Sequence, residues 1–152
     1  MQIVRISAGS TPDSVARLLA PLLTENLGQP VVVENRGGAG GNVGTDFVAK
    51  QPADGYTILM ANVAPMAINV TLYGKLPYDP VKDFTPIAHV WATYQAVVVS
   101  AKLPVASVAE LIAYAKARPG KISWGASTPG TVQHLSGEMF KRMVGIDIVF
   151  IP

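Results

Sequence analysis

The sequence contains no cysteine among its 152 residues, and this absence removes several kinds of chemistry at once. Without a thiol the chain has no disulfide, no thiolate nucleophile and no thiolate metal ligand. Charge is also scarce, at 14% of residues with a net charge of +2. Lysine and arginine are scattered rather than gathered in a basic stripe, so we expect no nucleic acid as partner. No apolar run reaches the roughly 18 to 20 residues that span a bilayer.

Catalytic groups are equally sparse. The two histidines, His89 and His134, lack carboxylates at the spacing of a metal site, so we expect structural roles for both and no bound metal. There is no G-x-S-x-G nucleophile motif and no pair of carboxylates that suggests an acid and a base. Ser10 or Ser127 could be imagined as a dyad with His134, but no spacing supports it. We therefore predict a protein that is not an enzyme and carries no cofactor.

What the chain does contain is apolar sequence, at 49% of residues, arranged in alternating short runs and helical patterns. The first part reads strand, helix, strand, helix, strand, which predicts an α/β fold with a parallel sheet and helices on its faces. Pro21 lies within the first helical pattern and predicts a kink or a split there. The predicted strands are 2–7, 30–34 and 56–61, and the predicted helices are 12–27 and 42–51.

The second part is less regular at first, and residues 62–85 are predicted to form ordered turns, including the PYDP segment. Residues 87–100 contain two further strand candidates. Ser107 and Glu110 form the signature of a capping box, which predicts a helix over 107–117. The pattern then predicts a strand over 121–125, a helix over 129–143 and a strand over 146–151. Because a parallel strand usually leads into another crossover, the end at Pro152 predicts that the chain is part of a longer protein.

The tripeptide Ser-Thr-Pro occurs at residues 10–12 and again at 127–129. A chance repeat is expected in a chain of this length, but both copies stand between an apolar run and a helical pattern. Threonine favours the N-cap and proline the first helical position, so each copy predicts a strand-to-helix turn. Free backbone N–H groups and partial positive charge make such a turn an anion site. Asp13 either stabilises its own helix end or contacts an amino group of a ligand.

A second idea comes from the glycine-rich loop of residues 37–44, which follows a predicted strand and opens a helix. A nucleotide-dependent enzyme would use such a loop to hold phosphates. The G-x-G-x-x-G pattern fails here, because Val43 stands where its third glycine would be. The next strand ends near Asn62, where an acidic ribose ligand would be expected. The nucleotide-dependent enzyme therefore remains the alternative hypothesis.

Several segments together resemble a known family. These are "VENRGGAGGNVG", "ADGYT", "LPYDPVKDFTPIAHV" and "KISWGASTPGTVQHLSGEMFK", in this order along the chain. They are similar to the solute-binding receptors of tripartite tricarboxylate transporters, also called the Bug family. The resemblance implies an extracytoplasmic, periplasmic receptor with the two-lobed, type II periplasmic-binding-protein fold. It implies capture of a small carboxylate (a dicarboxylate, a tricarboxylate or an acidic amino acid) and delivery to a membrane permease.

The resemblance also implies a domain arrangement and a site. Residues 1–92 would begin lobe one and residues 93–152 would begin lobe two. Loops 8–13 and 126–131, one in each lobe, would face one cleft and hold the ligand carboxylate, with Asn62 as a further candidate. The expected ligand-binding residues are Ala8, Gly9, Ser10, Thr11, Asp13, Asn62, Ala126, Ser127, Thr128, Gly130 and Thr131.

Two departures from the family pattern matter. The first loop is commonly close to "PPGG" in the family, whereas here it reads "SAGSTPD", so the hydroxyls of Ser10 and Thr11 would change ligand choice. A complete mature receptor is about twice as long, so the carboxy-terminal half of the family fold and the leader are expected to be absent from this chain. The truncated chain would expose apolar surface and self-associate. The third hypothesis is accordingly a fragment with no binding function of its own.

Overall fold

The computed structural model describes residues 1–5, 8–126 and 129–152, and the described chain divides into two compact units, residues 1–92 and 93–152. The first unit contains a parallel sheet of three strands in the order β2-β1-β3, namely β1 (Gln2–Arg5), β2 (Val32–Asn35) and β3 (Thr57–Met60). Ile3 of β1 is in register with Val33 on one side and Ile58 on the other. The predicted α/β fold with a parallel sheet is confirmed.

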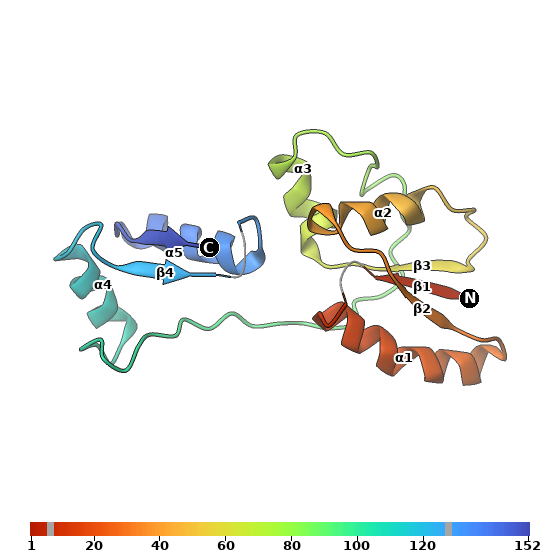
Figure 1. The fold of residues 1–152 in the computed structure, drawn as a ribbon, viewed down its shortest axis with the longest axis horizontal. Coiled ribbons are helices and arrows are strands. Elements are labelled where there is room, and N and C mark those ends of the chain that lie inside the picture. The colour runs from red at the N-terminus through yellow and green to blue at the C-terminus, as the bar shows by residue number, and fades with distance from the viewer. Residues whose placement is uncertain (6–7, 127–128) are drawn as a thin grey trace. The chain divides into compact units, whose positions relative to one another are not determined.

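Two helices cover the two faces of this sheet (Figure 1). Helix α1 (Thr11–Leu27) packs against β1 and β2, and α2 (Asn42–Ala49) packs against β3 and β1. The core under α1 is formed by Ile3, Ala16, Ala20 and Met60, all of them buried. Small alanines on the buried face of α1 allow the helix to approach the strands closely, since each fills little space between them.

Helix α1 continues through Pro21 to the C-cap Gly28, so the predicted split is wrong. Proline has no N–H for the carbonyl of Arg17, one turn earlier. Pro21 itself is exposed, so it lies on the solvent side, where a lost intrahelical hydrogen bond is least costly.

The rest of the first unit is built from short turns. A 3₁₀ turn, η1 (Ala39–Gly41), leads into α2, while a π-helical turn, η2 (Ala64–Ile68), leads into α3 (Asn69–Leu72). After α3 the PYDP segment forms an ordered turn, as expected, because Asp79 Oδ1 accepts hydrogen bonds from Val81 N at 2.9 Å and Lys82 N at 3.1 Å. The two backbone N–H groups lower the pKa of the Asp79 carboxyl.

The second unit contains helix α4 (Val108–Lys116), strand β4 (Ser123–Gly125), helix α5 (Val132–Val144) and strand β5 (Val149–Ile151). The two strands are parallel and Trp124 is in register with Phe150. The predicted cap of α4 by Ser107 is confirmed, and the reciprocal bond to Glu110 comes from the residue before the N-cap. Ser107 Oγ accepts from Glu110 N at 3.2 Å, and Glu110 Oε2 accepts from Ala106 N at 2.7 Å.

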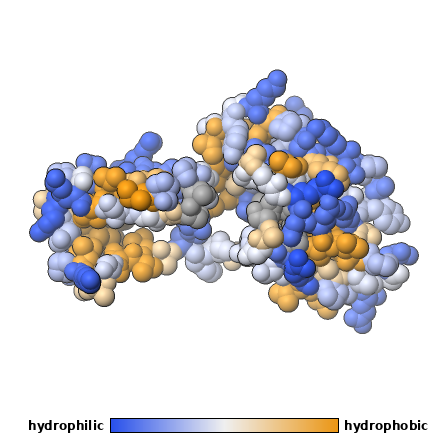
Figure 2. All heavy atoms as spheres, in the orientation of Figure 1, coloured by the Kyte–Doolittle hydropathy of each residue, from blue (hydrophilic) through white to orange (hydrophobic). Residues whose placement is uncertain are grey.

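The two strands predicted within residues 87–100 are wrong, since no strand forms in this described segment. A strand is stabilised by backbone hydrogen bonds to a neighbouring strand. Neither sheet of the described chain includes this segment. Val97 and Val98 are consequently exposed, at 64% and 86% of their surface. Figure 2 shows further apolar side chains on the surface of each unit.

Candidate functional site

The three strands of the first unit end at one edge of the sheet, because they are parallel and Arg5 of β1 is in register with Asn35 and Met60. The chain leaves this edge in three loops: residues 8–10 before α1, residues 36–41 before α2, and residues 61–63 before η2. Ligands of open α/β folds bind beyond the carboxyl ends of the strands. The first predicted loop and Asn62 therefore emerge from the same edge of this sheet.

At the start of α1 the N-cap is Ser10, and Thr11 and Pro12 are the first and second helical residues. The prediction that Thr11 caps the helix is therefore wrong by one residue. Ser10 has the extended backbone of an N-cap (φ −81°, ψ 167°), whereas Gly9 before it has φ +71°. Glycine allows this left-handed turn, which redirects the chain into the helix. Ala8 and Gly9 are both exposed.

Asp13 stabilises this turn from within the helix. Its Oδ2 accepts a hydrogen bond from Gly9 N at 2.6 Å, and its Oδ1 accepts from Arg17 Nε at 2.8 Å. Only 5% of Asp13 is exposed. A carboxylate at this position also complements the positive end of the helix. Of the two roles expected for Asp13, the structure provides contacts for the first, stabilisation of its own helix end.

The second helix begins later than predicted. Thr131 is the N-cap of α5, and its Oγ1 accepts from His134 N at 3.4 Å. Pro129 lies in the preceding turn, not at the first helical position, so the prediction for the second tripeptide is wrong. Ser127 and Thr128 lie outside the described residues. Ala126 is half-buried directly after β4, and Gly130 is buried with φ +82°.

The two loops nevertheless share one arrangement, which the sequence analysis missed. In each, a left-handed glycine precedes the N-cap and donates its N–H to the side chain four residues later. The acceptor is Asp13 Oδ2 for Gly9 and His134 Nδ1 for Gly130, the latter at 3.2 Å. The glycine stands before the tripeptide in the first loop and after it in the second. The signal in the sequence is thus Gly-Ser/Thr-x-x-Asp/His, not Ser-Thr-Pro.

Asn62, the remaining predicted residue of the first unit, is exposed just after β3. Its Oδ1 accepts from Ala64 N at 3.0 Å, a local turn that starts η2. Its side-chain carbonyl is thus used by the chain itself.

The glycine-rich loop of residues 37–44 is closed by polar side chains of its own unit. Asn69 Nδ2 donates to Asn42 Oδ1 at 2.6 Å and to the carbonyl of Gly40 at 3.1 Å. Tyr78 OH lies 2.9 Å from the same Asn42 oxygen. A Cβ at Gly40 would stand 3.3 Å from both Asn69 Nδ2 and Tyr73 OH. Close packing within the unit therefore accounts for this glycine without a nucleotide, and nothing in the loop supports the alternative hypothesis.

Tyr78 is the buried titratable group of this network, with 7% of its surface exposed. Burial raises the pKa of its phenol, and the Asp46 carboxylate adds to this rise, against a lowering contribution from the hydrogen bond with Thr45. The hydroxyl also lies 2.8 Å from the carbonyl of Pro65. Tyr78 therefore remains a neutral donor that ties residues 65 and 42 together.

His134 has the structural surroundings that we expected for a lone histidine. Its ring is stacked on Trp124, with centroids 6.1 Å apart and 6° between planes, and lies 4.4 Å from the Phe150 ring. His89 is exposed. Among residues 1–5, 8–126 and 129–152, no group of three or more metal-ligating side chains could hold an ion. Within the same residues, no helix has the length and hydropathy required to cross a membrane.

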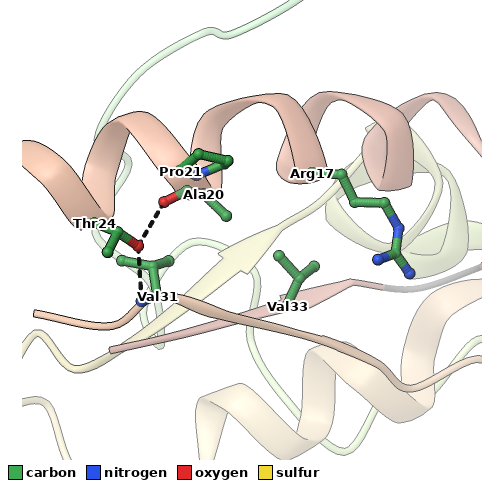
Figure 3. A pocket seen from close by; sticks show the side chains of 6 residues that line it. All are labelled: Arg17, Ala20, Pro21, Thr24, Val31 and Val33. Carbon is green, nitrogen blue, oxygen red and sulfur yellow. Dashed lines mark hydrogen bonds between the residues drawn. The ribbon is translucent and has the colours of Figure 1, made fainter.

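The described residues of the first unit form two open grooves whose linings include no predicted ligand-binding residue. One, of about 360 Å³, lies between α1 and β2 (Figure 3). Its hydroxyl group is already used, because Thr24 Oγ1 donates to Ala20 O at 2.8 Å and accepts from Val31 N at 3.0 Å. The other, of about 410 Å³, is lined by residues within 66–81. These grooves are not the predicted site.

Comparison with known proteins places this geometry in context. The sequence profile of the Tripartite tricarboxylate transporter family receptor matches residues 15–152. Protein BugT of Bordetella pertussis is 42% identical over 151 residues, which cover 99% of this chain and 46% of BugT. The chain thus spans about half the length of the relatives it matches.

Two solved structures are similar to this chain over its whole length. The R. palustris protein Rpa4515 with adipate is 39% identical and superposes with a TM-score of 0.78, over 100% of this chain and 51% of that one. MatC from Rhodopseudomonas palustris, with bound malate, is 26% identical with a TM-score of 0.72, over 100% and 52% of the two chains.

Proposed function

Because the chain belongs to the tripartite tricarboxylate transporter receptor family, we propose that it captures a small carboxylate for a transporter of that family. The observation that carries the proposal is the presence of adipate in one structural neighbour and malate in another. Both ligands are dicarboxylates. The proposal includes that the protein acts in the periplasm, delivers its ligand to a membrane permease and catalyses no reaction.

We propose further that residues 1–92 and 93–152 belong to the two lobes of such a receptor, and that loops 8–13 and 126–131 and Asn62 contribute to ligand binding. The starts of α1 and α5 support this, since the first turn of a helix offers backbone N–H donors and partial positive charge. The two loops differ in charge. Asp13 already places a carboxylate at the start of α1, whereas α5 has no acidic residue in its first turn. We therefore expect the loop before α5 to contribute more to carboxylate affinity.

Isothermal titration calorimetry of the chain with adipate, malate, citrate and glutamate tests the proposal, with NAD and ATP as the competing ligands. We expect at least one carboxylate to bind and neither nucleotide to do so. Rpa4515 with adipate serves as the positive control. Nucleotide binding without carboxylate binding would establish the alternative enzyme hypothesis. No binding of any ligand would leave the chain as a fragment without a binding function, and would overturn the proposal.

A matched pair of variants tests the site. Thr131→Ala and Ser107→Ala each remove an N-cap oxygen that accepts a backbone N–H, at 3.4 Å and 3.2 Å. Both weaken a helix start by a similar amount, about 1 kcal/mol. Only Thr131 belongs to a proposed ligand loop, so only Thr131→Ala should lower carboxylate affinity. Equal affinities of the two variants would contradict the assignment of this loop.

We also propose that the 152-residue chain self-associates in isolation. Apolar side chains lie on the surface of each unit (Figure 2). Large exposed hydrophobic residues include Leu18 at 72%, Val81 at 83% and Tyr94 at 96%. Exposed apolar surface of this extent favours association. Sedimentation velocity at increasing protein concentration tests this, and a monomer at every concentration would contradict it.

A further inference from the structure

Helices α1, α4 and α5 begin with the same side-chain contact. In each, the third helical residue accepts a hydrogen bond from the backbone N–H of the residue before the N-cap. The acceptors are Asp13 Oδ2 for Gly9 at 2.6 Å, Glu110 Oε2 for Ala106 at 2.7 Å and His134 Nδ1 for Gly130 at 3.2 Å. This is a variant of the capping box, shifted outward by one residue. The side chain thereby holds the turn that leads into its helix.

The acceptor in α5 differs in kind from the other two. A backbone N–H can only donate, so Nδ1 of His134 must carry its lone pair while this contact exists. A protonated imidazole carries a hydrogen on both nitrogens and has no acceptor left. Asp13 and Glu110 retain acceptor oxygens in either protonation state. Histidine is also the side chain whose charge ordinarily changes between about pH 5 and 8.

Packing fixes the ring of His134 in this orientation. It packs against Trp124, 6.1 Å away and nearly parallel, and against Phe150, 4.4 Å away, and these two rings also contact each other at 5.0 Å. Gly130 is buried, so its N–H depends on this acceptor when the ring is neutral. The ring is therefore held by packing while its Nδ1 accepts this hydrogen bond.

Few charged groups lie on the strands that pack against the ring. Strands β4 and β5 contain no titratable side chain, and Lys121 and Asp147 precede them at their amino ends. On α5, Glu138 is bound to Lys141 at 2.9 Å.

We propose that His134 is a positioning residue, which holds the Gly130 turn through its neutral Nδ1 and releases it when the ring is protonated. The statement that this turn belongs to a carboxylate-binding loop rests on the proposed function, but the hydrogen bond does not. While the ring is neutral, residues 129–131 are fixed at the start of α5. When the ring is protonated, the Gly130 N–H is free and the helix start gains a positive charge.

The test is an NMR titration of the backbone amides of the whole chain between pH 8 and 5. The Gly130 amide should lose its hydrogen-bonded chemical shift and its protection from exchange as the pH falls. The amides of Gly9 and Ala106 should not follow this titration, because their acceptors are carboxylates. They provide an internal control in the same spectra.

Two variants separate the acceptor from the ring. His134→Phe keeps an aromatic ring against Trp124 and Phe150 but has no acceptor, so Gly130 should show the low-pH state at every pH. His134→Asn places an acceptor at the same bond distance from the backbone without a titrating group, so Gly130 should show the high-pH state throughout. Retained dispersion of the other amides confirms that each variant is folded.

A Gly130 amide that does not change with pH overturns the proposal, as does the same titration in His134→Phe. Calorimetry with adipate at pH 7.5 tests whether this hydrogen bond affects ligand binding. Weaker binding by His134→Phe that is restored in His134→Asn supports a positioning role. An intact Gly130 titration without adipate binding supports the role of His134 and overturns only the proposed function.

Discussion

Gly137, in the middle of α5, faces the indole of Trp124 with no room for a side chain. A Cβ at this position would overlap Cη2 and Cζ3 of the ring and stand 2.8 Å from Cζ2. The backbone of Gly137 is helical, so alanine suffers no backbone strain here. Gly137→Ala therefore isolates the packing contribution of this one contact.

The expected magnitude follows from two opposing terms. Alanine favours a helix interior over glycine by about 1 kcal/mol. Overpacking a filled contact costs roughly 1 to 3 kcal/mol. The ring has little freedom to move away, because it is stacked on His134 and lies 5.0 Å from Phe150. We therefore take the upper end of the cost and expect α5 to be less stable by about 2 kcal/mol.

Hydrogen–deuterium exchange of peptides that cover residues 132–144 measures this locally. A loss of about 2 kcal/mol should speed exchange by roughly 30-fold. Gln133→Ala is the matched control, since it places alanine on the exposed side of the same helix. It should leave exchange nearly unchanged.

The same substitution in a Trp124→Leu variant tests whether Trp124 causes the loss of stability. In Trp124→Leu the ring is gone, so adding Gly137→Ala should slow exchange through the helix propensity of alanine alone. The sign of the effect of Gly137→Ala should thus reverse between the two backgrounds. Exchange that is unchanged or slower in the single variant would refute the overlap, and equal effects in both backgrounds would show that Trp124 is not its cause.

Three further predictions concern the other packed sites. Tyr78→Phe should lower the free energy of unfolding in urea by about 1 to 3 kcal/mol, because it removes a buried donor. Burial raises the pKa of Tyr78 in the folded state. The stabilising effect of Tyr78 is therefore fully present below pH 10 and is lost as the pH rises through the raised pKa. This loss of stability at high pH should be absent in Tyr78→Phe. Gly40→Ala should cost more than Gly55→Ala, because both have positive φ (64° and 81°) but only Gly40 has neighbours within 4 Å; equal urea midpoints would contradict this. Ser107→Ala should speed exchange in residues 108–116 by roughly 5-fold, as expected for about 1 kcal/mol, and unchanged exchange there would contradict the cap.

The elements that the sequence predicted well are those whose signals are local. The alternation of apolar runs and helical patterns predicted the parallel sheet of the first unit, and Ser107 with Glu110 predicted the start of α4. Capping interactions join residues three or four apart, so their partners can be identified in the sequence. The family resemblance, which rests on several such segments in order, is confirmed over residues 15–152.

The errors arose where local signals compete. Residues 87–100 have the composition of strands, but a strand also needs a partner, and composition carries no information about one. At the two Ser-Thr-Pro copies, more than one residue could serve as N-cap. At the first copy the N-cap is Ser10 rather than Thr11. At the second copy the N-cap is Thr131, three residues after the predicted Thr128. The left-handed glycine and the acceptor four residues on decided the helix starts, and neither was part of the repeated tripeptide.

The sequence by itself thus determined the strand and helix order of the first sheet, the fold class and the family, because apolar periodicity and short motifs act within a few residues. Only the tertiary structure decided which groups close the loops. The side chain of Asn42 contacts Asn69 and Tyr78, which are 27 and 36 residues away in the sequence. Gly137 has no room for a side chain because the ring of Trp124, on another element, lies against it. Such contacts depend on how folded elements meet in space, and the cost of an unpaired buried polar group or an overlapping Cβ appears only once they have met.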